Sequence, residues 1–301
     1  MEAVVIGNVT LDVICKPVDD VPRYDSLAFD DVIVAPGGCG SNVAIGLCAL
    51  GISTALVGRI GKDDAAHLVS RYWRSAGLDT RYVRRLKEFP TGTSVGLIDT
   101  DCQPRFVHTS GANKTLNPNV INIEKYIRDG ARSLHIGGFS VLPGLMKGNL
   151  DERLRQARMS DLYISLDVVR SIRMADTSLL WSCMPYLNVF LCNLTEAGRL
   201  SGENDPFVAS QILLSKGPEA VIVKLGENGC VLATKDGHVG HIAGVQAERV
   251  MDTTGAGDAF AAGLLAALLR GKDIADACQD ANRAGARAVE NLGAISCWLS
   301  R

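Results

Sequence analysis

One short glycine-rich stretch carries residue types that could do chemistry. It runs Asp252-Thr253-Thr254-Gly255-Ala256-Gly257-Asp258, and the apolar residues 259–269 follow it and end at Arg270-Gly271. A helix without a polar face is a buried one, and a glycine directly after a helix is a common stop. The first amides of that helix have no internal partners and lie at the positive end of its dipole. Because glycines let successive N–H groups converge, the stretch predicts an anion site, most simply one for phosphate.

Asp258 is unexpected beside a phosphate. One interpretation makes it a helix cap and the glycines a tight turn. The other makes it a general base that takes a proton from an acceptor hydroxyl, while the N–H groups stabilise charge on a transferring phosphoryl group. The loop alone supports both interpretations equally.

A second glycine-rich loop, residues 36–42, lies between an expected strand at 32–35 and an expected helix at 43–50. It lacks the Gly-Lys-Ser/Thr of a P-loop and the spacing of GxGxxG, so neither a P-loop NTPase nor a dinucleotide-dependent dehydrogenase is indicated. Its adjacent glycines allow a ligand to approach the main chain, and Asn42 can donate and accept hydrogen bonds at a hydroxyl-rich ligand.

Short apolar runs predict the strands that must position these loops. They lie at 3–7, 54–57, 134–136, 162–166, 189–191 and 221–223. Helical stretches of more than ten residues separate most of them, and this alternation predicts a parallel sheet with helices on both faces. Residues 248–251 are expected to end another strand just before the first loop. Residues 93–99 and 105–108 alternate around a polar turn and predict a hairpin.

Asp12 lies in a further extended segment, residues 11–15, which follows the strand at 3–7. A lone acid in an apolar strand is usually a turn or edge residue. Because α/β folds bind ligands where strands end, a binding role is at least as well supported.

Composition excludes several classes of function. The 301 residues carry a net charge of −2, with 47% hydrophobic and 21% charged residues, which is typical of a globular protein with a sizeable core. This charge gives no basic surface for nucleic acid or an anionic membrane. No apolar run is long enough to span a membrane, and we expect no export signal. The nine cysteines form no CxxC pair, so we expect reduced thiols in a cytoplasmic protein and no zinc site.

Taken together, the two loops resemble both signatures of the ribokinase-like (PfkB) carbohydrate kinases. The first is Gly37-Gly38-Cys39-Gly40-Ser41-Asn42-Val43-Ala44, followed by Gly51 and Gly61, and the second is 252–258, continuing through Ala262-Gly263. Between them, Asn193-Leu194-Thr195-Glu196 resembles the family's Asn-x-x-Glu element. Lys224-Leu225-Gly226-Glu227-Asn228-Gly229 resembles its nucleotide loop, and Gly111-Ala112-Asn113 matches a recurrent stretch. The resemblance spans essentially the whole chain in the right order.

The resemblance implies ATP-dependent transfer of the γ-phosphoryl group to a hydroxyl of a small sugar. The implied fold is an α/β, Rossmann-like three-layer sandwich over residues 1–301, a single kinase domain with a small β-sheet lid formed by about 11–35 and 91–108. Closure of such a lid excludes water and limits wasteful hydrolysis of ATP. Relatives often pair their lids, so we expect a homodimer through the lid.

The resemblance also implies roles for individual residues. Asp258 would be the base, and the amides of Gly255, Ala256 and Gly257 would form the anion hole. The nucleotide-binding residues would be Asn193, Glu196, Lys224, Gly226, Gly229 and Asn282. Glu196 would reach Mg²⁺ through water. The alternative for Asn193 and Glu196 is a helix-capping box, although their place directly after a strand favours function. Asp252, Thr254 and Ser296 would form a monovalent-cation loop, with K⁺ as the candidate ion.

The sugar end departs from ribokinase proper. Asp12, Gly37, Gly38 and Asn42 match sugar-contacting positions of the family. Thr10 stands where ribokinases have an asparagine, and Gly137-Gly138 stands where they have a sugar-binding glutamate, which disfavours ribose. Residues 167–170 resemble the Asp-x-Asn-x-Arg of fructokinase and ketodeoxygluconate kinase relatives, without the Asn. Arg170 would either contact an acidic sugar or pair with Asp167.

Two other functions fit the same pattern. A nucleoside kinase for adenosine, inosine or a related riboside would need an apolar or aromatic wall for the base, and Phe89, Phe106 and Phe139 are the candidates. A catalytically idle protein that senses a sugar is the other alternative. The intact loop with Asp258 argues against it.

Overall fold

A nine-stranded sheet forms the centre of the molecule. The computed structural model describes residues 1–169 and 177–299. Within them the strand order is β13-β12-β11-β10-β9-β8-β1-β4-β5. The bounds are β1 Ala3–Gly7, β4 Thr54–Gly61, β5 Asp79–Leu86, β8 Ser133–Gly137, β9 Tyr163–Asp167, β10 Val189–Asn193, β11 Ala220–Lys224, β12 Cys230–Thr234 and β13 Val239–Ile242.

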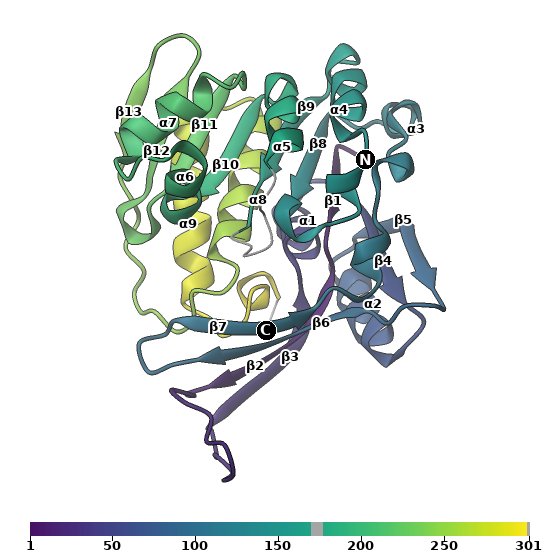
Figure 1. Cartoon of the computed structure of the whole chain (residues 1–301), viewed down its shortest axis with the longest axis vertical. Coiled ribbons are helices and arrows are strands. Elements are labelled where there is room, and N and C mark those ends of the chain that lie inside the picture. Colours follow the sequence, from purple (N-terminus) through teal and green to yellow (C-terminus); the bar gives the residue numbers. More distant parts are fainter. Residues whose placement is uncertain (170–176, 300–301) are drawn as a thin grey trace.

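Helices cover both faces of this sheet, as Figure 1 shows. Side chains alternate along a strand, so each buried strand contributes to two cores. Val5 and Leu191 pack with helices α1 (Cys39–Ala49), α2 (Asp64–Ser75), α8 (Ala256–Leu269) and α9 (Ile274–Val289). Ile6 and Phe190 pack on the opposite face with α3 (Ile123–Arg128), α4 (Leu150–Met159), α5 (Ser178–Cys183), α6 (Leu194–Ser201) and α7 (Pro206–Leu214). The predicted three-layer sandwich is therefore confirmed.

The prediction of a parallel sheet holds for seven strands and is wrong at one edge. β12 is antiparallel to β11, and β13 is antiparallel to β12. Only residues 225–229 join β11 to β12, and a parallel neighbour would need a crossover of a dozen residues or more. The large sheet is thus mixed.

The strand expected at 248–251 is also absent. No strand is assigned to these residues. Instead, the amides of Met251 and Asp252 donate to the carbonyl of Val289 at the end of α9, at 2.8 and 3.3 Å. Val250 is 52% exposed. Its apolar character is typical of a strand, but residues 248–251 pair with no strand, and the segment connects to α8 without regular structure.

A separate four-stranded sheet lies across one end of the sandwich (Figure 1). Its order is β3-β2-β6-β7, with β2 Thr10–Lys16, β3 Asp31–Gly37, β6 Gly92–Ile98 and β7 Pro104–Thr109. The hairpin predicted for 93–99 and 105–108 is β6–β7. On one face of this sheet Asp12, Ser94 and His108 lie in a cross-strand row. Asp12 and Ser94 are buried, so this inner face is turned toward the sandwich.

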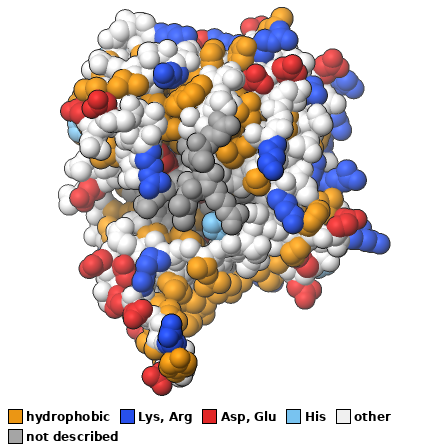
Figure 2. All heavy atoms as spheres, viewed as in Figure 1, with side chains coloured by type: hydrophobic (Ala, Val, Ile, Leu, Met, Phe, Trp, Pro, Cys, Tyr) orange, Lys and Arg blue, Asp and Glu red, His pale blue; other side chains and the backbone are white. Residues whose placement is uncertain are grey.

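The opposite, outer face of the small sheet is apolar. Val34, Val13, Val95 and Val107 form a cross-strand row on it. Val34 and Val107 are 41% and 67% exposed. In Figure 2, hydrophobic side chains gather over the part of the molecule that the small sheet occupies in Figure 1. Within the described residues, no helix is both long and apolar enough to cross a membrane.

Candidate active site

Several strands of the large sheet end at the edge that faces the small sheet. β9 ends at Asp167, β10 at Asn193 and β11 at Lys224, and all three strands are parallel. Asn193 and Lys224 are direct neighbours in the register. Ligands of open α/β sheets bind outside the carboxyl ends of such strands. The fold therefore places these three side chains where a ligand is expected.

The first turn of α8 reaches the same edge. Gly255 precedes the helix with φ of 77°, a conformation that favours glycine. A Cβ on Gly255 would lie 2.6 Å from the Cα of Ala294, so the loop also packs too closely for a side chain. Behind it, Ala259 to Ala267 are buried on every side, as the apolar run predicts. The amides of Ala256 and Gly257 thus lie at the positive end of a buried helix.

Asp258 lies in that first turn and meets the second glycine loop. Nδ2 of Asn42 donates a hydrogen bond of 2.7 Å to Oδ2 of Asp258. The thiol of Cys39 is a second hydrogen-bonding neighbour of the carboxylate. Burial raises the pKa of Asp258, while the Asn42 hydrogen bond, the charge of Lys224 and the Cys39 hydrogen bond partly oppose that rise. The two loops that the sequence singled out therefore meet at one carboxylate.

The helix that carries Asn42 begins earlier than predicted. The sequence suggested a start at residue 43, but α1 begins at Cys39. Gly38 makes the turn at φ of 85°, and a Cβ there would lie 2.6 Å from the carbonyl oxygen of Asn8. Because Gly38 completes the turn, Asn42 falls within the first turn of α1, and its side chain reaches Asp258 from there.

Asp12 brings the small sheet into the site. Thr10 Oγ1 donates to Asp12 Oδ1 at 2.5 Å, and Ser94 is a further side-chain partner. Burial raises the pKa of Asp12 to about 6 although both hydrogen bonds oppose it. The charge of Asp258 adds to the rise, so the two carboxylates lie near enough to interact. A Cβ on Gly37 would lie only 1.8 Å from Asp12 Oδ2, so the absence of a side chain there makes room for the carboxylate.

Lys224 pairs with Asp167. Its Nζ lies 3.1 and 2.8 Å from the two carboxylate oxygens, and the side chains are 13% and 6% exposed. Burial alone would lower the pKa of Lys224, but the carboxylates of Asp167, Glu196 and Asp258 together outweigh it and raise that pKa, so the ammonium stays charged. The sequence left open whether Asp167 pairs with Arg170. Arg170 lies outside the described residues, and Asp167 has a partner in Lys224.

Asn193 and Glu196 form the capping box that the sequence allowed. Asn193 Oδ1 accepts from the amide of Glu196 at 2.9 Å, and Glu196 Oε2 accepts from the amide of Asn193 at 2.8 Å. These two hydrogen bonds account for both residue types as a cap at the start of α6. Glu196 is buried, and its charge acts on both Asp167 and Lys224. One carboxylate thus caps a helix and faces the strand-end cluster.

The remaining residues predicted for the nucleotide lie on one flank of the site. Gly226 and Gly229 form a tight turn with φ of 63° and 86°. The 243–244 backbone packs on that turn, because a Cβ on Gly244 would lie 2.0 Å from the carbonyl oxygen of Glu227. Asn282 donates to the carbonyl of Ala243 at 3.0 Å. The structure therefore brings Asn282 and the predicted glycine turn together through this backbone.

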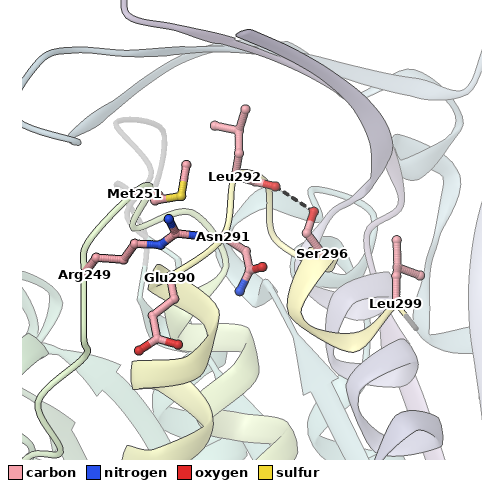
Figure 3. Close-up of a pocket in the computed structure, with 7 residues that line it drawn as sticks. All are labelled: Arg249, Met251, Glu290, Asn291, Leu292, Ser296 and Leu299. Carbon is pink, nitrogen blue, oxygen red and sulfur yellow. Dashed lines mark hydrogen bonds between the residues drawn. The ribbon is translucent and has the colours of Figure 1, made fainter. Parts of the chain in front are cut away.

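The residues predicted for a monovalent cation tie two loops together. Asp252 is fully buried, and its carboxylate accepts from the amides of Thr254 and Gly293, both at 2.8 Å. The Thr254 hydroxyl oxygen is buried, with no hydrogen-bond partner among the described residues. Ser296 donates its hydroxyl proton to the carbonyl of Leu292 at 2.6 Å. This bond is the dashed line in Figure 3.

A pocket of about 350 Å³ lies next to these loops (Figure 3). Its lining combines charged, polar and apolar side chains: Arg249, Met251, Glu290, Asn291, Leu292, Ser296 and Leu299. Among the predicted site residues, it includes only Ser296. It is therefore distinct from the space between Asp12 and Asp258.

Sequence reasoning missed three neighbours of the predicted residues. Cys39 contacts Asp258, and Ser94 and His108 continue the row that begins at Asp12. Cys39 lies inside the recognised first loop, so its position was a usable signal. No sequence signal indicated Ser94 and His108, because their place in the row with Asp12 depends on the register of the strands.

The assembled site has the parts of a phosphoryl-transfer centre. A partly buried carboxylate, helix-terminal amides and a largely buried ammonium lie together, and a second carboxylate on the small sheet lies near enough to interact with the first. A base and preorganised positive charge are what such a reaction requires of a protein. In the described residues, no group of three or more His, Cys, Asp and Glu could hold a metal by itself.

Comparisons with known proteins identify the family and agree with the fold. A family model described as pfkB family carbohydrate kinase matches residues 2–301. The chain is 30% identical to a 2-dehydro-3-deoxygluconokinase of Bacillus subtilis over 268 residues, 85% of this chain and 81% of that protein. It is 29% identical to an ATP-dependent ribose-1-phosphate kinase of Halopiger xanaduensis over 303 residues, 98% and 96% of the two chains. The crystal structure of a Thermotoga maritima ribokinase matches with a TM-score of 0.83 at 25% identity, covering 100% and 97%.

Proposed function

The chain belongs to the pfkB family of carbohydrate kinases, phosphotransferases with a hydroxyl acceptor, and we propose that it transfers the γ-phosphoryl group of ATP to a small sugar. The acceptor is a pentose, a hexose or a sugar acid. The observation that carries the proposal is the hydrogen bond between Asn42 and Asp258. It unites the two loops at a partly buried carboxylate, beside the amides that would receive the phosphoryl group.

In the proposed reaction, Asp258 takes the proton of the acceptor hydroxyl as its oxygen bonds to phosphorus and the bond to the ADP oxygen breaks. The amides of Gly255, Ala256 and Gly257 stabilise the charge on the phosphoryl oxygens. Asp12, Gly37, Gly38 and Asn42 hold the sugar, with Asp12 accepting from its hydroxyls. The partial exclusion of water around these residues strengthens each of these interactions.

ATP and Mg²⁺ fit the residues present. The glycine turn at 226–229 and Asn282 flank the nucleotide, and Asn193 and Glu196 face its phosphates. Mg²⁺ usually keeps several waters and takes only one or two carboxylates, in addition to the phosphates. Glu196 alone, acting through water, therefore suffices. When bound, the ion would neutralise phosphate charge.

A monovalent-cation site is proposed at Asp252 and Thr254. The support is the buried Thr254 hydroxyl oxygen, which lacks a protein partner within the described residues and lies two residues from a fully buried carboxylate. K⁺ is the candidate ion. Ser296 is the weaker ligand because its hydroxyl is engaged by Leu292. Replacing K⁺ by tetramethylammonium should then lower kcat, and an unchanged kcat would remove this part of the proposal.

The small sheet is proposed to act as a lid within one kinase domain. Its inner face carries Asp12, and its apolar outer face, with Val34 and Val107, suits the lid of a second copy. A homodimer through the lids would cover that face. The nine cysteines are all free thiols, which supports a cytoplasmic location. Light scattering of Val107→Lys beside the wild type tests the dimer, since a monomeric mass for both would reject it.

The sugar class is proposed from the relatives and the residues together. The curated relatives include a sugar-acid kinase and a sugar-phosphate kinase by name. Arg170, which lies outside the described residues, would favour an acidic acceptor if it contacts the sugar as the resemblance implies. Of the aromatic residues considered for a nucleoside base, Phe139 is core and Lys114 covers Phe89. Phe106 lies on the inner face of the small sheet over Gly96, where it is the remaining candidate for the aromatic wall of a base. A nucleoside kinase is therefore the alternative.

The deciding experiment is a coupled ADP-release assay with ATP and Mg²⁺. The panel holds ribose, ribose 1-phosphate, fructose, ketodeoxygluconate, other hexoses and several nucleosides, each with and without K⁺. Turnover confined to sugars supports the proposal, and turnover on nucleosides alone transfers it to the alternative. Silence across the panel, with ATP still bound, would reject the proposed sugar kinase.

A further inference from the structure

We propose that Lys224 is a catalytic cation that binds the transferring phosphoryl group directly, and that Asp167 is the positioning residue that aims it. This inference rests on the proposed kinase function. It assigns Lys224 a role in the chemical step, in addition to a place beside the nucleotide.

The ammonium of Lys224 lies against the anion loop. A Cβ on Gly257 would be 3.2 Å from its Nζ. Gly257 lies in the first turn of α8, where the amides and the helix dipole already give positive charge. A cation at that end is unfavourable unless an anion lies between or beside them. The site therefore concentrates two sources of positive charge on the place where a phosphoryl group would lie.

Asp167 explains how Lys224 stays there before any phosphate arrives. Both of its carboxylate oxygens contact Nζ, at 3.1 and 2.8 Å, and both side chains are largely buried. An ammonium has three N–H donors. Two can go to Asp167, and the third can be donated to a phosphoryl oxygen beside Gly257. Asp167 thus fixes the lysine in the orientation that the reaction needs.

The surrounding charges give Lys224 a reason to be present. Asp167, Glu196 and Asp258 all act on its ammonium. Without it, a phosphoryl group approaching Asp258 would meet uncompensated negative charge at this site. Lys224 compensates for that charge and stays protonated throughout. In the transfer step, the phosphorus bond to ADP breaks, the bond to the acceptor oxygen forms and the acceptor proton goes to Asp258, so Lys224 exchanges no proton.

The test compares Lys224→Met with Lys235→Met, an exposed lysine on the turn after β12 that serves as the matched control. Loss of one preorganised donor to a transition state costs about 10²- to 10³-fold in kcat. We expect that loss for Lys224→Met and none for Lys235→Met. Isothermal calorimetry adds a readout that needs no turnover. Lys224→Met should bind a non-hydrolysable ATP analogue about tenfold more weakly, while its affinity for ADP stays within about twofold.

Asp167→Asn tests the positioning role. Like Lys224→Met, it should lower both kcat and the preference for the ATP analogue over ADP. The double variant Lys224→Met/Asp167→Asn should be no worse than Lys224→Met alone, because the two residues act through one contact. Additive losses would indicate that Asp167 acts independently of Lys224. Lys224→Met alone leaves Asp167 as a buried carboxylate without its cation, which can unfold the protein. The double variant replaces the ion pair by two neutral side chains, so kcat and nucleotide affinity can still be measured in that case.

The outcomes separate this inference from the proposed function. Wild-type turnover together with a Lys224→Met variant that keeps both kcat and the analogue preference would overturn the role of Lys224 and leave the kinase intact. A wild type that turns over no sugar rejects the kinase. In that case, the contact between Lys224 and the phosphate is also rejected if Lys224→Met prefers the ATP analogue over ADP as strongly as the wild type does.

Discussion

Asn42 and Asp258 are 216 residues apart in sequence, and the side-chain amide of one donates a 2.7 Å hydrogen bond to the carboxylate of the other. The bond joins the first turns of α1 and α8. Asn42 is 5% exposed, and its Oδ1 is buried without a hydrogen-bond partner among the described residues. Buried oxygens of this kind are normally satisfied. The amide thus orients the base with one end and presents the other end to a ligand hydroxyl.

Removing that amide should change the pH dependence of turnover. The Asn42 hydrogen bond favours the ionised form of Asp258 and so lowers its pKa. Asn42→Ala should therefore raise the apparent pKa of the acid limb of kcat, so that activity is lost at a higher pH as the solution is acidified. Asn149→Ala, on the surface at the start of α4, should leave the limb in place. An acid limb that stays unmoved in Asn42→Ala would show that Asp258 is not the titrating base.

Asp12 should control affinity for the sugar and not for ATP. An ionised carboxylate accepts strong hydrogen bonds from hydroxyls, and losing such bonds costs about tenfold or more in affinity. Asp12→Ala should raise the KM for sugar by that factor and change the KM for ATP by less than about twofold. Because the pKa of Asp12 is about 6, the wild-type KM for sugar should also rise as the pH falls from 7.5 to 5. In Asp12→Asn this pH dependence of KM should vanish. The opposite pattern, with ATP affected more than sugar, would reject the assignment.

Gly37→Ala tests the geometry that surrounds Asp12. The new Cβ would occupy a position 1.8 Å from Asp12 Oδ2, so the carboxylate must move. We expect the KM for sugar to rise about tenfold, as expected for loss of a charged hydrogen bond. Gly198→Ala in α6 is the matched control, because its Cβ would meet no atom closer than 3.4 Å. A normal sugar KM in Gly37→Ala would mean that Asp12 does not hold the sugar from this position.

The loops, most elements and their order could be predicted because local patterns determine them. The buried helix after Gly255 follows from its unbroken apolar run and the glycine that stops it. Residues 248–251 show where such patterns fail. Their apolar side chains satisfied the local pattern of a strand, but a strand needs a hydrogen-bonded neighbour, and the fold supplies none there.

Contacts within the site were less predictable because they depend on register and packing. The Lys224–Asp167 pair joins two strands that lie on either side of β10, and no sequence spacing indicates it. Ser94 stands beside Asp12 only because β6 pairs with β2 in one particular register. For Asn193 and Glu196 the same two residues satisfied both a structural and a functional pattern, so the sequence could not choose between them.

Cys39 should help to orient the base. Its thiol hydrogen bonds to Asp258 and lowers the pKa of that carboxyl, with less effect than Asn42. Cys39→Ala should therefore shift the acid limb of kcat upward by less than Asn42→Ala does, and Cys39→Ser, which keeps a donor, should restore most of the wild-type profile. Burial raises the pKa of the Cys39 thiol well above its usual range, so iodoacetamide should modify it slowly at pH 7.5. Identical profiles for the alanine and serine variants would count against the thiol as a donor.

Asp258→Asn is the sharpest test of Asp258 as the base, because the amide keeps the shape of the side chain and cannot take the proton. The measurement is steady-state ADP release with the best sugar of the panel, accompanied by calorimetric titration with a non-hydrolysable ATP analogue. We expect kcat to fall by about 10²- to 10⁴-fold, the range for a general base, and affinity for the analogue to change by less than about twofold. A kcat within tenfold of the wild type, with the analogue bound normally, would contradict it.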